Sequence, residues 1–225
     1  MALPGKLLAE ALGTALLLAT VVGSGIMGTQ LSDGNDGLAL LANAAATAGA
    51  LYVLITVLGP RSGAHFNPAV SLVARLRGEL GTRELLAYVL VQVVAAVAGV
   101  LLAHAMFGLA LLQPGDHVRT GAAQWLSEGV ATFGLVLVIR LGIAQRPAQV
   151  PMLVAAWIFA AYWFTASTSF ANPAVTLARA LTQSFAGIRP EDVGGFVAAQ
   201  LAGALLALPV ARALGDSRNP DVGAT

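Results

Sequence analysis

The side chains best suited to act on a solute lie in two copies of one tripeptide. Asn67-Pro68-Ala69 and Asn172-Pro173-Ala174 each follow a stretch of small and polar residues, and each precedes a short apolar run. Asparagine favours the position just before a helix, and proline fits the first helical position because its missing N–H would be unpaired there. Each tripeptide therefore predicts the start of a short helix, over Pro68–Arg77 and Pro173–Thr182.

Two such helices would favour neutral solutes over ions. A helix of about ten residues is about 15 Å long, which is about half the hydrocarbon core of a bilayer. If the two helices enter from opposite sides, their N-termini meet at mid-membrane, where each carries about half a positive charge. Facing positive ends repel cations, including hydronium. The Asn67 and Asn172 amides can meanwhile donate hydrogen bonds to a passing neutral solute.

The composition of the chain indicates a membrane protein. Of its 225 residues, 57% are hydrophobic and 10% are charged, and the mean hydropathy is +0.80. Soluble domains average about 25% charged residues, so this chain lacks the charged surface of a soluble globule. Its hydrophobicity excludes a disordered chain, and its net charge of +1 leaves no basic face for nucleic acid. The absence of cysteine excludes disulfides and thiolate metal sites.

Six segments are long and apolar enough to cross a bilayer, which requires about 20 residues each. They are Leu7–Met27, Leu38–Leu58, Glu84–Phe107, Ala122–Ile143, Val150–Ala166 and Asp192–Ala213. Turn-forming residues separate them. We therefore expect an all-α membrane protein with six transmembrane helices and two half-membrane re-entrant helices, forming a single transmembrane domain over residues 1–225.

The two halves of the chain repeat three landmarks in the same order. They are Glu10 and Glu128, which are 118 residues apart, Asn67 and Asn172, which are 105 apart, and Gln92 and Gln200, which are 108 apart. Each half, residues 1–110 and 120–215, holds three spans. Because three is an odd number, the second half must be inverted relative to the first. Transport proteins build such inverted repeats around a site at mid-membrane.

Positive charge is unequally distributed over the connecting segments, and an excess of lysine and arginine marks the cytoplasmic side. With the N-terminus inside, the inner segments hold nine of these residues and the outer segments hold three. The inner nine are Lys6, Arg61, Arg75, Arg77, Arg83, Arg140, Arg146, Arg212 and Arg218, and the outer three are Arg119, Arg179 and Arg189. We therefore expect both termini in the cytoplasm and the protein in the cell membrane.

The sequence resembles the aquaporin and glycerol-facilitator channels of the major intrinsic protein family. The resemblance covers the whole chain and rests on the six spans, the two Asn-Pro-Ala tripeptides, and the paired glutamates and glutamines. It implies a passive channel for water and small uncharged solutes, which are its partners together with the lipid bilayer. It also implies a homotetramer with one pore per subunit. Separately, His104 and His117 have no partners at metal-ligand spacing, so we expect no metal site, and we expect no cofactor.

The sequence departs from that family at a second constriction, which usually includes an arginine directly after the second tripeptide. Here that position is Val175, and an ungapped count from the tripeptides puts the other three positions at Thr47, Ala160 and Ser169. None of the four is aromatic, histidine or arginine, so we expect a wide mouth that admits solutes larger than water and excludes ions less well. The valine resembles that of bacterial members linked to arsenic resistance, which implies small neutral polyols and metalloid hydroxides such as arsenite as solutes.

Arg179 lies one helical turn beyond Val175 and has two interpretations. It partly replaces the missing charge of the constriction, or its long side chain extends to the outer lipid headgroups. We favour the second interpretation, because long basic side chains near helix ends commonly reach the membrane interface.

Five further side chains are ionisable or carry amides at membrane depth. Glu10 and Glu128 either relay protons or accept backbone N–H groups from the broken stretch before each half-helix, which the resemblance favours. Gln92 and Gln200 are expected to bond backbone carbonyls between helices. His65 is expected either to line the cytoplasmic vestibule or to form a hydrogen bond between loops.

An ion-coupled secondary transporter that uses Glu10 or Glu128 is the alternative to a passive channel, because inverted repeats serve both kinds of protein. An enzyme would need a nucleophile paired with a base, or a metal-binding motif such as H-E-x-x-H. The sequence contains neither, so we expect no catalytic activity.

Overall fold

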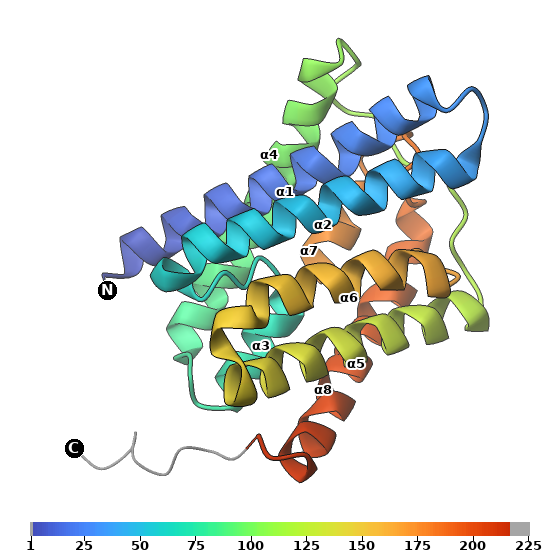
Figure 1. Ribbon diagram of the computed structural model, residues 1–225. Coiled ribbons are helices and arrows are strands. Elements are labelled where there is room, and N and C mark those ends of the chain that lie inside the picture. Colours follow the sequence, from blue (N-terminus) through green and yellow to red (C-terminus); the bar gives the residue numbers. More distant parts are fainter. Residues whose placement is uncertain (1, 217–225) are drawn as a thin grey trace.

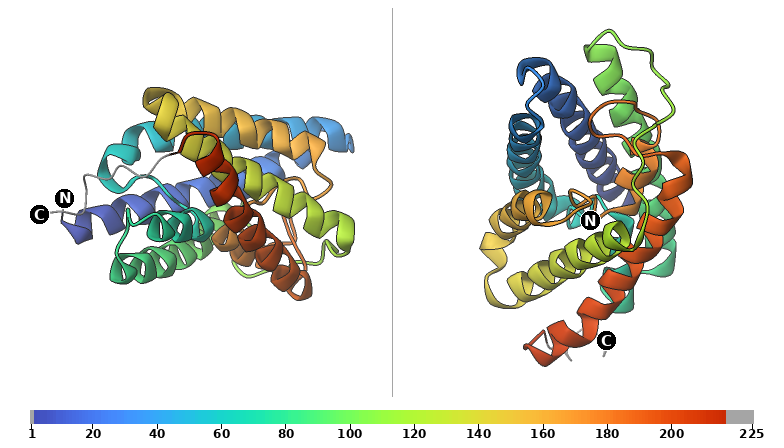
Figure 2. Two further views of the ribbon diagram at one scale, coloured as in Figure 1. Left: turned by 90° about the horizontal axis from the view of Figure 1, so that it is seen from below. Right: turned by 90° about the vertical axis from the view of Figure 1, so that its right-hand side faces the viewer.

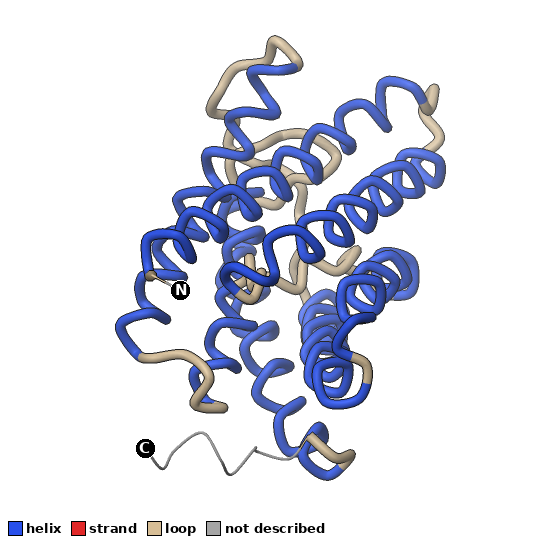
Figure 3. The backbone as a smooth tube through the Cα atoms, turned by 60° about the vertical axis from the view of Figure 1, so that its left-hand side comes forward, coloured by secondary structure: helices blue, strands red, loops and turns tan. Residues whose placement is uncertain are grey.

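The computed structural model describes residues 2–216, and every regular element in that range is a helix (Figure 1, Figure 3). The six long helices are α1 (Leu3–Leu31), α2 (Asp36–Ser62), α4 (Thr82–Met106), α5 (Ala122–Gln145), α6 (Val150–Phe164) and α8 (Val193–Ala213). Two short helices are α3 (Pro68–Leu76) and α7 (Pro173–Arg179). Single 3-10 turns, η1 (Pro147–Gln149) and η2 (Pro190–Asp192), precede α6 and α8.

This architecture confirms the predicted all-α membrane fold. All six long helices, α6 and α8 counted with their 3-10 turns, are long and apolar enough to cross a membrane. Each predicted span overlaps one of them, and the ends differ by a few residues. Of the basic residues used to orient the chain, Arg218 lies outside the residues that the structure describes.

The second short helix is shorter than predicted. It ends at Arg179, three residues before Thr182, where the chain turns back on itself. The Ile188 N–H donates to the Arg179 carbonyl at 3.2 Å, and the Thr182 hydroxyl lies 2.8 Å from His104 Nε2. These contacts hold the segment after α7 as a folded loop, and the helix cannot continue into it.

The short helices lie among the long ones, and each contacts long helices of both halves of the chain (Figure 1, Figure 2). In the first half α1 packs against α2 and α4, and in the second half α5 packs against α6 and α8. The contact between α2 and α6 joins the halves. In addition, α3 packs against α8, and α7 packs against α4. Each short helix is therefore enclosed partly by the other half.

Glycine allows the closest of these helix contacts. A Cβ atom on Gly99 of α4 would lie 2.3 Å from the Ala15 carbonyl oxygen of α1. A Cβ atom on Gly203 of α8 would lie 2.2 Å from the Gly129 carbonyl oxygen of α5. Lipid gives no hydrophobic drive for helices to associate, so backbones that approach closely gain packing contacts instead. Each half thus joins its first and last long helices through one glycine.

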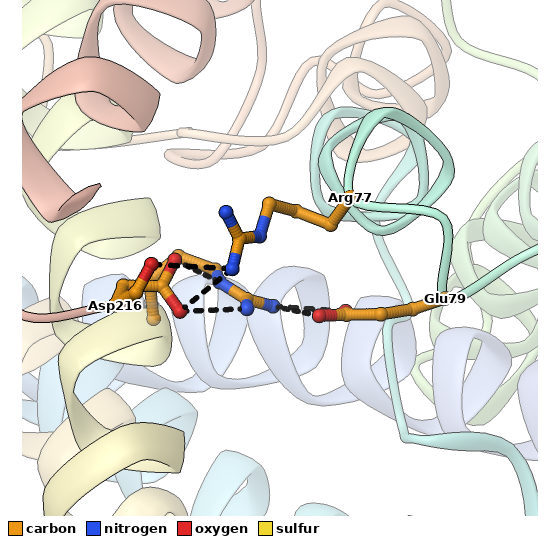
Figure 4. A network of polar contacts seen from close by, with 4 residues as sticks. Arg77, Glu79 and Asp216 are labelled. Carbon is orange, nitrogen blue, oxygen red and sulfur yellow. Dashed lines mark hydrogen bonds and ion pairs between the residues drawn. The ribbon is translucent and has the colours of Figure 1, made fainter. Parts of the chain in front are cut away.

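A buried ionic network closes the face of the bundle that carries both described chain ends, which we call the terminal face. Asp216 accepts hydrogen bonds from Arg77 Nη2 at 3.2 Å, and from Arg140 Nη2 and Nε at 2.9 and 3.0 Å (Figure 4). Arg140 Nη1 also donates to the Glu79 carboxylate at 2.8 Å. The side chains of Arg77, Arg140 and Asp216 are at most 5% exposed. The network ties the end of α8 to α5 and to the turn after α3.

The glycine contact predicts the effect of a single methyl group. We expect Gly203→Ala to lower the thermal unfolding midpoint in detergent, because overpacking at a close backbone contact costs about 1–3 kcal/mol. Gly194→Ala on the same helix is the control, since no atom lies within 4 Å of a Cβ there. Alanine favours helix over glycine by about 1 kcal/mol, so the control should unfold at the same temperature or higher. Equal midpoints for the two variants would contradict the close contact.

The ionic network predicts that Asp216→Ala destabilises the protein. Its loss leaves two buried guanidinium groups without this carboxylate, and breaking a buried ion pair costs about 3–5 kcal/mol. Thermal or denaturant unfolding in detergent measures the change. Glu191→Ala is the control, because its pair with Arg189 at 3.4 Å is exposed and such pairs contribute little. The network has no stabilising role if the two variants lose equal stability.

Candidate functional site

The two Asn-Pro-Ala tripeptides meet inside the bundle. Asn67 Nδ2 donates to the Ala171 carbonyl at 2.7 Å, and Asn172 Nδ2 donates to the Phe66 carbonyl at 2.7 Å. Each amide therefore bonds the residue just before the other tripeptide. These two reciprocal hydrogen bonds hold the N-termini of α3 and α7 next to each other.

Each asparagine is also the N-cap of its short helix. Asn67 Oδ1 accepts from the Ala69 N–H at 2.9 Å, and Asn172 Oδ1 accepts from the Ala174 N–H at 3.0 Å. The proline of each tripeptide occupies the first helical position, as the sequence predicts. A side-chain amide has two N–H groups, and the opposite carbonyl takes one of them. The second N–H is available to the cavity that both asparagines line.

Two fully buried glutamates bond the irregular backbone that leads into the short helices. Glu10 accepts the backbone N–H groups of the two residues before Asn67, at 3.0 and 2.7 Å. Glu128 accepts those of the two residues before Asn172, at 2.8 and 2.9 Å. These stretches are not helical, so their N–H groups have no partners in a helix ladder. The geometry agrees with the structural interpretation of both carboxylates.

The same stretches contain non-glycine residues in the left-handed backbone region. Ala64 and Phe66 both have φ near 49°, and Ser169 and Ala171 have φ near 52° and 48°. Such conformations cost about 1–3 kcal/mol each and persist only where the surroundings fix them. Phe66 and Ala171 are also the residues whose carbonyls accept the asparagine amides. The glutamates and asparagines together fix this backbone.

Gln92 and Gln200 bond side chains, so the predicted backbone-carbonyl partners are wrong. Gln92 Nε2 donates to Glu10 Oε2 at 2.8 Å and to the Ser71 hydroxyl of α3 at 3.0 Å. Gln200 makes the corresponding bonds in the second half, to the buried glutamate and to a hydroxyl of α7. A buried carboxylate is stable when donors satisfy its oxygens. The glutamines supply such donors from the third long helix of each half.

A cavity of about 280 Å³ passes the paired asparagines. Its walls are mostly aliphatic side chains of α1, α2, α5 and α6. Its polar lining consists of Glu79, Arg140, His65, Asn67, Asn172, Thr47, Tyr162, Ser169 and Arg179. Glu79 and Arg140 belong to the network at the terminal face. Arg179 ends α7 close to the last turn of α4, at the opposite face of the bundle, which we call the distal face. An apolar passage with few polar groups is typical of a site for small molecules.

His65 lines the cavity, and its side chain bonds a residue of α3 instead of a residue of another loop. Its side chain lines the cavity on the terminal side of Asn67. Its Nδ1 is hydrogen-bonded to the Ser71 hydroxyl at 3.0 Å, and its ring packs edge-on against Tyr88 with centroids 5.4 Å apart. The imidazole is therefore a fixed part of the cavity wall.

Three of the four residues that the ungapped count assigned to the constriction line the cavity, and the fourth does not. Thr47, Ser169 and Val175 are buried and face the cavity. Ala160 is exposed on the outside of α6, so its assignment is wrong. The count fails because it assumes one fixed length of chain between α6 and the second tripeptide.

Tyr162 faces the cavity from α6, the helix on which Ala160 points away. Its hydroxyl donates to Thr47 Oγ1 at 3.3 Å. Val154, Ile158 and Tyr162 all line the cavity, and their spacing of four residues puts them on one face of a helix. This spacing is visible in the sequence and is the signal that could have identified Tyr162.

Arg179 also lines the cavity, so the favoured interpretation that it extends to the headgroups is wrong. The residue is 2% exposed, and its Nε donates to the Ala186 carbonyl. Its guanidinium carbon lies 3.3 Å from the centroid of the Phe170 ring. Tyr162 and Arg179 both face this part of the cavity, so an aromatic and an arginine side chain lie there although none of the four counted positions carries one.

Known proteins share both the sequence and the fold. The chain matches the major intrinsic protein family over residues 1–162. It is 60% identical to the aquaglyceroporin AqpS of Rhizobium meliloti (strain 1021) over 207 residues, which cover 92% of this chain and 88% of that one. It is 32% identical to the aquaporin TIP2-2 of Zea mays over 87% of this chain and 83% of that one.

A solved structure has the same fold. The X-ray structure of the aquaglyceroporin from Plasmodium falciparum superposes with a TM-score of 0.75 over 95% of this chain and 98% of that one, at 16% sequence identity. Similarity in fold at this identity and similarity in sequence to the curated relatives agree. The chain therefore belongs to the major intrinsic protein family.

Proposed function

We propose that this protein is a passive transmembrane channel for small uncharged solutes. The preferred solutes are polyols and metalloid hydroxides such as arsenite, and water passes as well. The observation that carries the proposal is the cavity that passes both asparagine amides between mostly aliphatic walls. Relatives that are named aquaglyceroporins and aquaporins support the same function.

The paired asparagines favour neutral solutes over protons and other cations. Both short helices begin at this point, and each helix N-terminus carries about half a positive charge. A neutral solute with oxygen atoms accepts the free amide N–H of Asn67 and then that of Asn172. A hydronium ion meets repulsion from both helix ends.

Val175 supports passage of solutes larger than water. It lines the cavity at the position where the family usually has an arginine, and its side chain is smaller and uncharged. Uncharged arsenite, As(OH)₃, resembles a small polyol because both present hydroxyl groups on a compact body. Thr47 offers a hydroxyl to such solutes on the same stretch of the cavity.

The alternative of an ion-coupled transporter has less support. Its coupling site would be Glu10 or Glu128, and neither residue lines the cavity. Both carboxylates are fully buried and accept hydrogen bonds from the backbone and from a glutamine. A carboxylate that bonds the chain in this way is not free to bind and release a coupling ion.

We further propose that residues 1–225 form one channel domain with inverted repeats over 1–110 and 120–215. The distribution of lysine and arginine supports cytoplasmic termini in the cell membrane. The family resemblance supports a homotetramer with one pore in each subunit.

Proteoliposomes test the proposed function directly. Stopped-flow light scattering should show faster water and glycerol movement in vesicles with the protein than in empty vesicles, and arsenite should enter faster by measured arsenic content. A passive channel needs no proton gradient, so adding a protonophore should leave these rates unchanged. Rates equal to those of empty vesicles would refute the channel, and rates that fall with the protonophore would favour the transporter.

The width proposed at Val175 predicts the effect of restoring the family arginine. We expect Val175→Arg to reduce glycerol permeability by tenfold or more, which corresponds to an added barrier of about 1.4 kcal/mol. Water permeability should fall less, because water is smaller. Val175→Thr has nearly the size of the native residue and should conduct glycerol as the wild type does. Undiminished glycerol flux through Val175→Arg would show that residue 175 does not limit the width.

A further inference from the structure

We propose that Arg179 supplies the positive charge that excludes cations from the distal half of the pore. The proposal rests on the channel function proposed above and assigns its cation selectivity to a residue one helical turn beyond the usual arginine position. It also replaces the expectation, drawn from Val175 alone, that ions are excluded less well.

The first support is position. Arg179 is the last residue of α7, and it lines the same cavity as Val175 on the preceding turn. Helix residues four apart lie on the same face. An arginine at 179 therefore faces the passage from the same side as an arginine at 175 would, but one turn nearer to the distal face.

The second support is how the guanidinium is held. Its Nε donates to the Ala186 carbonyl, and its guanidinium carbon lies over the Phe170 ring, 3.3 Å from the centroid. Phe170 is itself fixed, because its N–H donates to Glu128 at 2.8 Å and its ring packs edge-on against Phe196. Within residues 2–216, no hydrogen bond uses the two Nη groups of Arg179. The fixed orientation therefore leaves these groups as donors to the contents of the cavity.

The third support is that the charge has no counter-ion nearby. Among the described residues, no carboxylate oxygen lies within 4.0 Å of the Arg179 guanidinium. Arg140, the other arginine that lines the cavity, is paired with Glu79 and Asp216. The pore thus carries a paired charge at its terminal end and an unpaired positive charge in its distal half.

A second arginine near the same ring acts differently. The guanidinium carbon of Arg119 lies 5.0 Å from the centroid of Phe170. Its Nε, Nη1 and Nη2 donate to three backbone carbonyls, and its side chain does not line the cavity. Arg119 therefore holds the loops around the distal mouth, while its charge adds to the positive potential that Arg179 creates.

These contacts define which solutes the distal half admits. A buried charge without a partner is costly unless polar groups solvate it, so oxygen atoms in the cavity must meet the Nη groups. A polyol or a metalloid hydroxide brings oxygen atoms that accept hydrogen bonds from the Nη groups. A sodium ion meets repulsion in a poorly screened, low-dielectric passage.

The chain has no cysteine, which allows the charge at 179 to be removed and then restored chemically. In proteoliposomes of Arg179→Cys we expect the sodium leak to exceed that of the wild type by about tenfold or more. The cationic reagent 2-aminoethyl methanethiosulfonate forms a mixed disulfide with the thiol, releases methanesulfinate and restores a positive charge. It should return the leak toward the wild-type value. Methyl methanethiosulfonate adds an uncharged group and should not.

Two further comparisons separate the charge from its side effects. Arg189→Gln removes one positive charge from the distal face at a residue that does not line the cavity, and it should leave the leak unchanged. Arg179→Lys should keep the leak low, and Arg179→Gln should raise it, with glycerol flux showing that each variant is folded.

Four results would overturn the proposal. The first is a sodium leak no larger than that of the wild type in an Arg179→Cys or Arg179→Gln variant that still conducts glycerol. The second is an equal fall in the sodium leak with the charged and the uncharged reagent, and the third is a sodium leak in Arg189→Gln as large as that in Arg179→Gln. The fourth is glycerol flux only in the variants that keep the charge. The proposed channel function fails separately, by absence of glycerol and water flux in the wild type.

Discussion

Non-helical backbone inside a membrane needs hydrogen-bond partners for its N–H and C=O groups. The site around the two asparagines depends on the side chains that supply these partners. Glu10 and Glu128 accept the N–H groups that precede each short helix, and each asparagine amide bonds a carbonyl in the other half of the chain. Lipid offers no such partners, so the irregular stretches are stable only where these side chains enclose them. The passage exists because the two non-helical segments supply hydrogen-bond partners to each other.

The same bonds determine which groups remain for a solute. Each asparagine uses its oxygen to cap its own helix and one N–H to bond the opposite repeat. One N–H is left over, and it is rigidly aimed because the other groups of the amide are engaged. A donor that is positioned before the solute arrives costs little to use. Structural and functional roles are thus divided among the atoms of one side chain.

Charge in the passage is arranged unequally along its length. At the terminal face, Arg140 is paired with Glu79 and Asp216, in a network that also closes the bundle. The middle carries helix ends and amides, and Arg179 adds a full charge in the distal half. Mostly aliphatic walls separate these groups, and a low-dielectric wall extends the reach of each charge. Under the proposed function, selection against cations acts at two levels of the same passage.

The sequence by itself determined the six spans and the starts of both short helices at Pro68 and Pro173, because hydropathy and capping are local properties of the chain. The residues alone left two roles open for Glu10 and Glu128, and the family resemblance favoured bonds to broken backbone. Only the tertiary structure decided which side chains face the cavity. Ala160 and Arg179 were misjudged and Tyr162 was missed, because the direction in which each side chain faces depends on the rotation of α6 and on the loop that ends α7 at Arg179. Contacts with residues far away in the chain set both.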